Sequence, residues 1–159
     1  FDGQPLDGMA GRKVLLAAPH AVAVLPMLPD QHVVLVGQYR PAVGWTVEVP
    51  AGKVDPTDAD HLAAAQRELR EETGLTGGTW REAGSILPSP GSSTEEIHLF
   101  VAQGFDEDWK HPPPADPFSP HPVVVEASAV WDTIRTGHQV DAKTSALMAW
   151  ALANGVLWP

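Results

Sequence analysis

Three carboxylates stand close together in residues 67–75, which read RELREETGL: Glu68, Glu71 and Glu72. Residues three and four apart share one face of an α-helix, so a helix here would gather them in one patch just before Gly74. Such a patch is unfavourable alone, because the carboxylates repel one another and lie at the negative end of the helix dipole. Mg²⁺ or Mn²⁺ would remove that repulsion, since both prefer oxygen ligands. One interpretation of the segment is therefore a metal site.

The other interpretation is a solvated, charged helix face. Arg67 and Glu71 are four residues apart and would form an ion pair on such a face, which stabilises a helix by roughly a few tenths of a kcal/mol. Charged runs of this kind are common on exposed helices. The residues before the segment decide between the two interpretations.

The longer segment GKVDPTDADHLAAAQRELREETGL, residues 52–75, strongly resembles the Nudix box of the Nudix hydrolases. That pattern is a glycine, five residues, a glutamate, seven residues and then R-E-U-x-E-E-x-G-U, where U is bulky and apolar. Gly52 opens the box, and RELREETGL matches its end at every constrained position. Two features depart from this pattern: Asp58 replaces the first glutamate, and eight residues rather than seven separate it from Arg67. We expect this insertion to alter the entrance to the helix and to leave the glutamate face intact.

The resemblance implies an α/β fold, a Nudix-type α/β/α sandwich with a mixed β-sheet, that hydrolyses nucleoside diphosphates linked to a second group. It assigns Glu68, Glu71 and Glu72 to Mg²⁺, directly or through water, with the backbone carbonyl of Ala51 as a further ligand. It assigns Arg67 to orienting the glutamates by charge-assisted hydrogen bonds. This chemistry suits the residues, because clustered divalent ions neutralise phosphate charge and make water nucleophilic near neutral pH.

Segments outside the box look similar to one branch of the family, the ADP-ribose pyrophosphatases and related nucleotide-sugar hydrolases. These segments are QYRPAVGWTVEVPAGKVDP, PSPGSSTEEIHLFVA and GHQVDAKT. In this branch Arg40 would contact the pyrophosphate, Glu48 would lie near the terminal sugar or the metal, and Glu95 would project towards the metals. Each residue also has a structural alternative: Arg40 as a surface charge at a strand end, Glu48 as a solvent-facing strand residue, and Glu95 as an edge-strand charge against aggregation.

The main departure from that branch is the segment HPPPADPFSPHP, where relatives usually carry glutamates, one of them proposed to activate water. Counting back from Gly137, the acidic position falls near Asp116, which we nominate as general base. His121 is an alternative, because imidazole titrates near neutral pH, although a histidine among prolines is more often a surface residue. Glu72 and Glu95 are further alternatives.

Trp45 is the aromatic residue that we expect to stack on a nucleobase or ribose. The chain has six tryptophans, and most of the others are expected to pack in the core or at an interface. Relatives in this branch are usually homodimers that exchange N-terminal strands. We expect a homodimer here, but only the arm of residues 1–12 precedes the first predicted strand, which is short for such an exchange.

The composition of the 159 residues limits the class of protein. With 43% hydrophobic residues the chain is expected to form one domain over 1–159, with an N-terminal arm at 1–12, the box at 52–75 and a proline-rich loop at 106–122. The absence of cysteine excludes disulfides and thiolate metal sites. A net charge of -10 argues against nucleic-acid binding. Prolines interrupt the most apolar run, so we expect no membrane span or signal peptide and a cytoplasmic location.

The elements predicted around these residues alternate between strands and helices. Strands are expected at 13–18, 20–28, 32–39, 46–49, 79–87, 96–105 and 122–127. A long loop at 49–60 leads into the glutamate helix, which begins after Asp58 or Asp60 and ends at Gly74. Two more helices are expected at 128–137 and 141–155, the second with Asp141 as its N-cap. This order predicts an α/β sandwich.

The leading functional hypothesis is a Mg²⁺-dependent diphosphatase. It would cleave ADP-ribose or a related nucleoside diphosphate sugar to a nucleoside monophosphate and a sugar phosphate. Two alternatives stay open: hydrolysis of another substrate, such as a dinucleoside polyphosphate or a coenzyme, and a Nudix-fold sensor that binds nucleotides without catalysis. An intact set of glutamates argues against the sensor.

Overall fold

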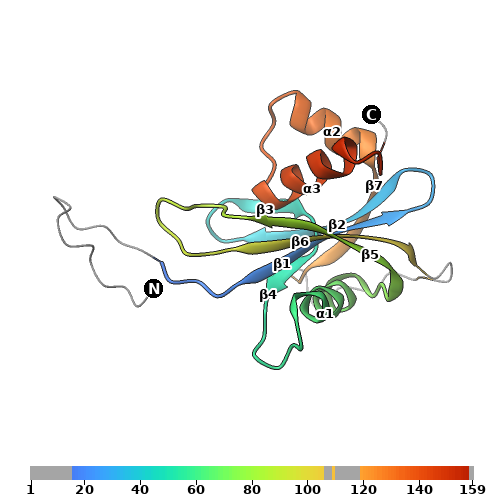
Figure 1. Ribbon diagram of the computed structural model, residues 1–159. Coiled ribbons are helices and arrows are strands. Elements are labelled where there is room, and N and C mark those ends of the chain that lie inside the picture. The colour runs from blue at the N-terminus through green and yellow to red at the C-terminus, as the bar shows by residue number, and fades with distance from the viewer. Residues whose placement is uncertain (1–15, 106–108, 110–118, 158–159) are drawn as a thin grey trace.

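The structure of the protein is a computed structural model that describes residues 16–105, 109 and 119–157 (Figure 1). Two sequence-based predictions fall outside these ranges: the N-terminal arm at 1–12 and the general base Asp116. Most of the proline-rich loop at 106–122 lies outside them as well. The other predicted site residues lie within the described ranges.

A mixed β-sheet forms the middle layer, and the described residues contribute seven strands to it. The main path runs β3-β2-β1-β6-β5, while β4 pairs with β1 and β7 pairs with β2. The strands are β1 (Ala21–Leu28), β2 (His32–Arg40), β3 (Gly44–Glu48), β4 (Ala51–Lys53), β5 (Gly77–Ile86), β6 (Ile97–Phe105) and β7 (His121–Glu126). The pair β1·β6 is parallel, and the other pairs among these strands are antiparallel.

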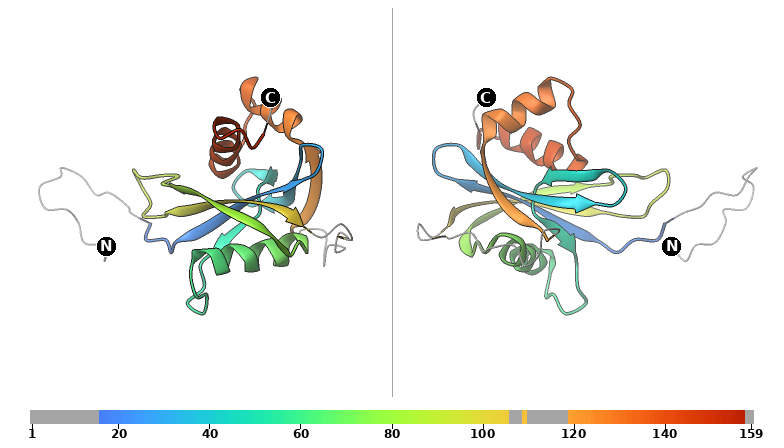
Figure 2. Two further views of the ribbon diagram at one scale, coloured as in Figure 1. Left: turned by 45° about the vertical axis from the view of Figure 1, so that its right-hand side comes forward. Right: turned by 180° about the vertical axis from the view of Figure 1, so that it is seen from behind.

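Helices cover both faces of the sheet. Helix α1 (His61–Thr73) lies on one face, and α2 (Ala127–Arg135) and α3 (Ala142–Ala153) lie together on the other (Figures 1 and 2). This confirms the predicted α/β/α sandwich with a mixed sheet. None of the helices in the described ranges has both the length and the apolar character needed to cross a membrane.

Strand β1 lies at the centre of the core, because its two faces pack against different helices. Val22 and Val24 belong to the hydrophobic cluster that includes α1. Ala23 and Leu25 belong to the cluster on the α2 and α3 side. A strand buried on both faces has no polar alternation, which explains the continuous apolar run in this part of the sequence.

Strands β1 and β2 pair over two residue pairs next to their turn, Met27 with Val33 and Leu28 with His32. Towards its start β1 pairs instead with β4 at residues 21–23, and β2 pairs with β3 at residues 36–40. The two strands therefore separate, and β3 and β4 occupy the space between them. The chain from β3 to β4 carries Glu48, Ala51 and Gly52 into this part of the sheet.

Local capping fixes both ends of α1. The side chain of Asp60 accepts a hydrogen bond from the backbone N–H of Ala63 at 2.8 Å, which makes Asp60 the N-cap of the two predicted alternatives. At the other end Gly74 adopts the left-handed conformation, with φ of 78°, and its N–H donates to the carbonyl of Arg70. The helix thus begins and ends where the sequence predicts.

Two predicted elements are wrong. The strand expected at 13–18 is absent from its described residues, 16–18, where Leu16 forms an isolated bridge to Ser93. Ser93 directly follows the turn at residues 90–92, so pairing with Leu16 does not extend into a strand. Conversely, β4 lies where the sequence predicts only loop. Glycine and lysine disfavour strands, but pairing with β1 supplies backbone hydrogen bonds that outweigh this local preference.

Candidate active site

The carboxyl group of Glu68 packs directly on the backbone of β4 at Gly52. A methyl group on the Gly52 Cα would overlap all three atoms of that carboxyl group. A glycine is therefore required at this position for Glu68 to approach the strand so closely. The first glycine of the box and the first glutamate of RELREETGL thus form one contact, although they are far apart in the sequence.

Glu72 lies one helical turn beyond Glu68 and also reaches β4. Its Oε2 accepts a hydrogen bond from the backbone N–H of Ala51 at 3.0 Å. Burial raises the pKa of Glu72 to about 7, the Ala51 hydrogen bond opposes this shift, and the charge of Glu68 adds to it. A buried carboxylate that is costly to ionise gains from a cation, so the donor set fits a hard divalent metal.

Arg67 joins the glutamate face to the loop before the helix. Its Nη1 donates to Glu68 Oε1 at 2.7 Å and to Glu71 Oε2 at 3.2 Å. Its Nε and Nη2 donate to the two oxygens of Asp58 at 3.1 and 2.9 Å, and Nη2 also donates to the Lys53 carbonyl. Asp58, the residue that departs from the family pattern, is thus an ion-pair partner of Arg67. The inserted residue leaves the helix contacts with β4 in place.

Glu48 is the centre of a second network of charges. Arg40 donates to both of its carboxylate oxygens, at 3.1 and 2.8 Å, and Lys143 Nζ lies 2.9 Å from Oε2. Thr46 Oγ1 donates to Oε1 at 2.6 Å. Burial raises the pKa of Glu48, but these partners outweigh it and hold that pKa at about 2. Glu48 is therefore ionised and fixed in position across the ordinary pH range.

The network around Glu48 rules out one of the alternatives that the sequence left open. The Glu48 side chain is only 5% exposed, so the interpretation of Glu48 as a solvent-facing strand residue is wrong. Arg40 is more open, and it lies at the end of β2 with its guanidinium turned onto Glu48. Glu95 lies two residues before β6, where its N–H donates to Ser93 Oγ at 3.1 Å.

A pocket of about 420 Å³ brings most of these groups to one place. Its lining includes Arg40, Glu48, Gly52, Lys53, Glu95 and Lys143. Glu68 and Glu72 do not line this pocket themselves, but they contact Gly52 and Ala51, which do. The pocket therefore combines cationic side chains with acidic ones, and Glu68 and Glu72 lie against its β4 residues, an arrangement suited to a phosphate compound together with a divalent cation.

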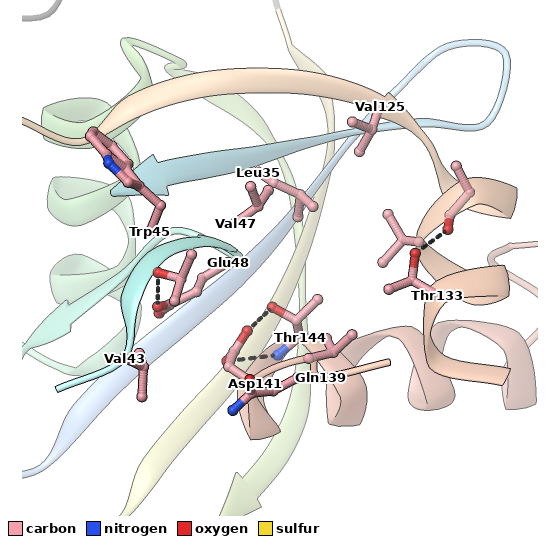
Figure 3. Close-up of a pocket in the computed structure, with 14 residues that line it drawn as sticks. Leu35, Val43, Trp45, Val47, Glu48, Val125, Thr133, Gln139, Asp141 and Thr144 are labelled. Atoms are coloured by element: carbon pink, nitrogen blue, oxygen red, sulfur yellow. Dashed lines mark hydrogen bonds between the residues drawn. The ribbon is translucent and has the colours of Figure 1, made fainter. Parts of the chain in front are cut away.

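A second pocket, of about 560 Å³, adjoins the first through Glu48 and Asp141, which line both (Figure 3). Trp45 and Val47 line it from β3, Val125 from β7, and Thr133 from α2. Figure 3 shows Trp45 at one end of the pocket and Thr133 at the other. A mainly apolar lining with a few polar groups suits a flat ring with polar edges, such as a nucleobase.

Lys143 is the main residue that sequence reasoning missed. Lys143 is the second residue of α3. Its Nζ lies 2.9 Å from Glu48 Oε2 and 2.8 Å from Asp141 Oδ1. Burial lowers the pKa of Lys143, but the two carboxylates outweigh this effect and raise the pKa above its ordinary value. A positive charge in the first turn of a helix interacts unfavourably with the positive end of the helix dipole. That position was therefore a signal, in the sequence, that Lys143 needed acidic partners.

The predicted base residues are not all brought to the pocket. Asp116 lies outside the described residues. His121 begins β7, where its ring lies 6.1 Å from that of Trp45, and it is not among the described lining residues of either pocket above. Among the residues nominated as base, Glu95 lines the smaller pocket and Glu72 contacts its floor.

Comparison with known proteins identifies relatives. The chain is 37% identical over 102 residues to a methanol dehydrogenase activator of Bacillus methanolicus, covering 64% of this chain and 55% of that protein. It is 35% identical over 98 residues to an ADP-ribose pyrophosphatase of Bacillus subtilis, covering 61% and 52%. The chain thus spans about half the length of these curated relatives.

A solved structure and a family model cover more of the chain. The crystal structure of an ADP compounds hydrolase matches with a TM-score of 0.70 and 20% identity, covering 87% of this chain and 75% of that one. At this identity the match shows the fold. The model of the NUDIX domain matches residues 18–144. This range contains the box, Lys143 and the β3 residues that line the two pockets. The chain therefore belongs to the NUDIX domain family.

Proposed function

We propose that the protein is a Mg²⁺-dependent pyrophosphohydrolase, with Mn²⁺ as an effective substitute. It cleaves the diphosphate of ADP-ribose or a related nucleoside diphosphate sugar and releases a nucleoside monophosphate and a sugar phosphate. The observation that carries this proposal is the contact of two box glutamates with β4: Glu68 packs on Gly52, and Glu72 accepts a hydrogen bond from the Ala51 N–H. These β4 residues line a pocket together with Arg40 and Lys143.

The metal proposal is supported by the donor chemistry. Glu68, Glu71 and Glu72 present carboxylate oxygens, the ligands that Mg²⁺ and Mn²⁺ prefer, and the Ala51 carbonyl remains a proposed further ligand. Divalent ions bound here would neutralise phosphate charge and lower the pKa of bound water. Arg67 fixes the orientation of Glu68 and Glu71 through the hydrogen bonds described above.

The protein groups have separate roles in the proposed reaction. Arg40 binds the pyrophosphate, and Glu48 holds Arg40 and Lys143 at the pocket so that both cations face the substrate. Trp45 offers an aromatic surface for the nucleobase or ribose in the larger pocket. We assign Glu95 to receive a proton from water, because it lines the same pocket as Arg40, Gly52 and Lys143. Asp116 remains a proposed alternative base.

The relatives support the substrate class. One relative named above is an ADP-ribose pyrophosphatase, and the solved structure is named as a hydrolase of ADP compounds. We also propose that residues 1–159 act as one domain, in the cytoplasm, on a small molecule rather than on nucleic acid. A homodimer is part of the proposal: Val43, just before β3, and Trp45 and Val47 in β3 form an exposed apolar row that also lines the larger pocket, so a second copy packed on this row would lie beside the bound substrate.

A substrate panel tests the proposed reaction. The purified chain is incubated with Mg²⁺ and ADP-ribose, nucleotide sugars, diadenosine polyphosphates, dinucleotide coenzymes or nucleoside triphosphates, and the products are identified by mass. ADP-ribose or a nucleotide sugar is expected to give the highest kcat/KM. A different preferred substrate would change the assigned substrate class, and binding without turnover would favour the sensor.

A pair of glutamate variants tests the metal role. Glu71→Gln and Glu72→Gln are each expected to lower kcat by about a hundredfold or more, because an amide neither neutralises nor holds the cation as a carboxylate does. Circular dichroism should show an unchanged fold. Unaltered rates in both variants would remove the proposed metal site, whatever the substrate.

A further inference from the structure

Three histidines outside the proposed active site converge from distant parts of the chain. His20 directly precedes β1, His61 is the first residue of α1, and His98 lies in β6. Each offers one ring nitrogen, and the three nitrogens all lie within 4.8 Å of one another. His20 Nδ1 and His98 Nε2 are 3.2 Å apart. We call these residues the histidine cluster; within the described residues, no other group of three metal-ligating side chains lies so close together.

The sheet register explains why the rings meet. In the parallel pair β1·β6, Val22 lies beside His98, and Val22 packs on the face of the sheet that α1 covers. His98 therefore points to the same layer as α1, whose first turn supplies His61. The rings of His61 and His98 are stacked with centroids 3.5 Å apart, and the His20 ring is stacked 5.5 Å from His98. The backbone of three separate elements thus sets the position of the histidine cluster.

The chemistry of the histidine cluster suits a borderline transition metal. Imidazole nitrogens favour Zn²⁺ and similar ions, whereas Mg²⁺ prefers oxygen ligands. Burial, together with the neighbouring His61 ring, holds the pKa of His98 below its ordinary value. A neutral imidazole carries the lone pair that a metal requires. Ligand type therefore separates the histidine cluster from the carboxylates of Glu68, Glu71 and Glu72.

One distance in the histidine cluster is already close to that of a zinc site. With Zn–N bonds of about 2.0–2.1 Å, two nitrogens of a tetrahedral site lie roughly 3.3–3.4 Å apart. The His20 and His98 nitrogens are 3.2 Å apart, and the nitrogens of all three residues lie within 4.8 Å of one another. The stacked rings must turn about χ2 so that their lone pairs converge, and χ2 is a broad torsion for histidine. The His20 side chain is 55% exposed, so it has room to turn.

Glu96 provides a neighbouring negative charge. Its Oε2 lies 3.8 Å from His20 Nδ1, and its Oε1 accepts a hydrogen bond from Ser85 Oγ at 2.7 Å. A carboxylate held in this way adds negative charge beside the histidine cluster, which favours a bound cation. The exposed side of His20 leaves access for water as a fourth ligand.

We propose that His20, His61 and His98 form a binding site for Zn²⁺ or a similar transition-metal ion, separate from the proposed catalytic metal site. Such an ion would join the first turn of α1 to β1 and β6. Glu68 lies seven residues further along α1, about 10 Å along the helix axis, so the ion would hold the helix that carries the box glutamates. This proposal does not depend on the substrate or on catalysis.

Zinc binding is measured on the complete chain without an affinity tag, after chelation and dialysis, in a buffer with excess Mg²⁺. Calorimetric titration with Zn²⁺ is expected to show one site per chain. Thermal unfolding should occur about 5 °C higher at a hundredfold excess of Zn²⁺ over its Kd, because the ion binds the folded chain. Absence of Zn²⁺ binding would overturn the proposal.

Variants locate the bound ion. His20→Ala is expected to weaken Zn²⁺ binding at least tenfold and to fold normally, since His20 is exposed. His98→Ala should have the same effect on binding, but the side chain is partly buried, so His20→Ala is the decisive variant. His138→Ala is the matched control, because His138 is exposed just after α2 and its turn and contacts Thr136 instead of the cluster.

Glu72→Gln controls for zinc in the carboxylate site and is expected to retain full Zn²⁺ affinity. Equal affinities in the unmodified chain and in His20→Ala would overturn the histidine site. Loss of binding in Glu72→Gln with retention in His20→Ala would overturn it as well, and would place the ion at the glutamates.

Discussion

At the scale of single residues, the contact between Gly52 and Glu68 explains why the box needs both. The glutamate carboxyl group occupies the space that any side chain at position 52 would fill. Helix α1 can therefore present Glu68 against β4 only if the strand carries no Cβ there. The backbone N–H of the preceding residue, Ala51, holds Glu72 by a hydrogen bond. One short strand thus positions two of the proposed metal ligands.

Gly52→Ala is predicted to displace Glu68 and to lower Mg²⁺-dependent kcat by about tenfold to a hundredfold, with a higher Mg²⁺ concentration needed for half activity. Steady-state kinetics against Mg²⁺ concentration checks this. Gly91→Ala is the matched control, because a methyl group there meets no atom within 4 Å. Equal metal dependence in the two variants would contradict the proposed role of the contact.

Glu48 provides a prediction for stability against pH. Its pKa of about 2 in the folded protein lies below the ordinary 4.5, so its ionised form stabilises the folded state above pH 4.5. That contribution, about 3 kcal/mol at most, is lost as pH falls from 4.5 to 2. The sign follows from the lowered pKa: the unfolded chain takes up the proton first.

Glu48→Gln should therefore lower the free energy of unfolding at pH 7 and weaken its dependence on pH between 4.5 and 2. Urea denaturation at pH 7, 4.5 and 3 measures both effects. Glu82→Gln, at an exposed position in β5, serves as control. If Glu48→Gln and the unmodified chain lose stability in parallel on acidification, the network around Glu48 does not stabilise the fold as described.

At the scale of elements, Arg67 connects α1 to the loop before it. The guanidinium contacts Asp58 in the loop and the Lys53 carbonyl at the end of β4, and it contacts Glu68 and Glu71 on the helix. A lysine has a single ammonium group and cannot make these contacts together. The orientation of the glutamates thus depends on a residue whose planar group spans two elements.

Arg67→Lys is predicted to lower kcat by about tenfold or more and to raise the Mg²⁺ concentration for half activity, with a smaller change in KM for the substrate. Arg70→Lys is the control, since Arg70 is exposed on the same helix. Kinetics with varied Mg²⁺ separates the two effects. A change confined to KM would instead indicate that Arg67 contacts the substrate.

Much of the element order and the proposed glutamate ligands could be predicted from sequence because their signals are local. Asp60 and Gly74 show the ends of α1 by their types alone, and the spacing of the glutamates shows their shared face. Strand β4 could not be predicted, because its pairing with β1 is a long-range contact between residues with low strand propensity. The burial of Glu48 also depends on distant Lys143.

At the scale of the whole molecule, the exposed row on β3 is the surface that we assign to a homodimer. Val47→Asp is predicted to shift the protein from dimer to monomer, because a buried, unpaired carboxylate is costly at an apolar interface. Light scattering coupled to size-exclusion chromatography measures the mass. Leu87→Asp, at an exposed position beyond the end of β5, is the control. A monomeric unmodified chain would contradict the proposed dimer.

The central position of β1 has a consequence for biosynthesis. The ribosome completes β1 long before it makes β6, the parallel neighbour that covers one of its edges. Until then one edge of the apolar segment AVAVLPML lacks its native neighbour, and such segments tend to aggregate. One edge of this apolar strand therefore stays unpaired until β6, late in the chain, has been translated. Slow translation of residues 54–96 should prolong this vulnerable interval and lower the yield of native protein.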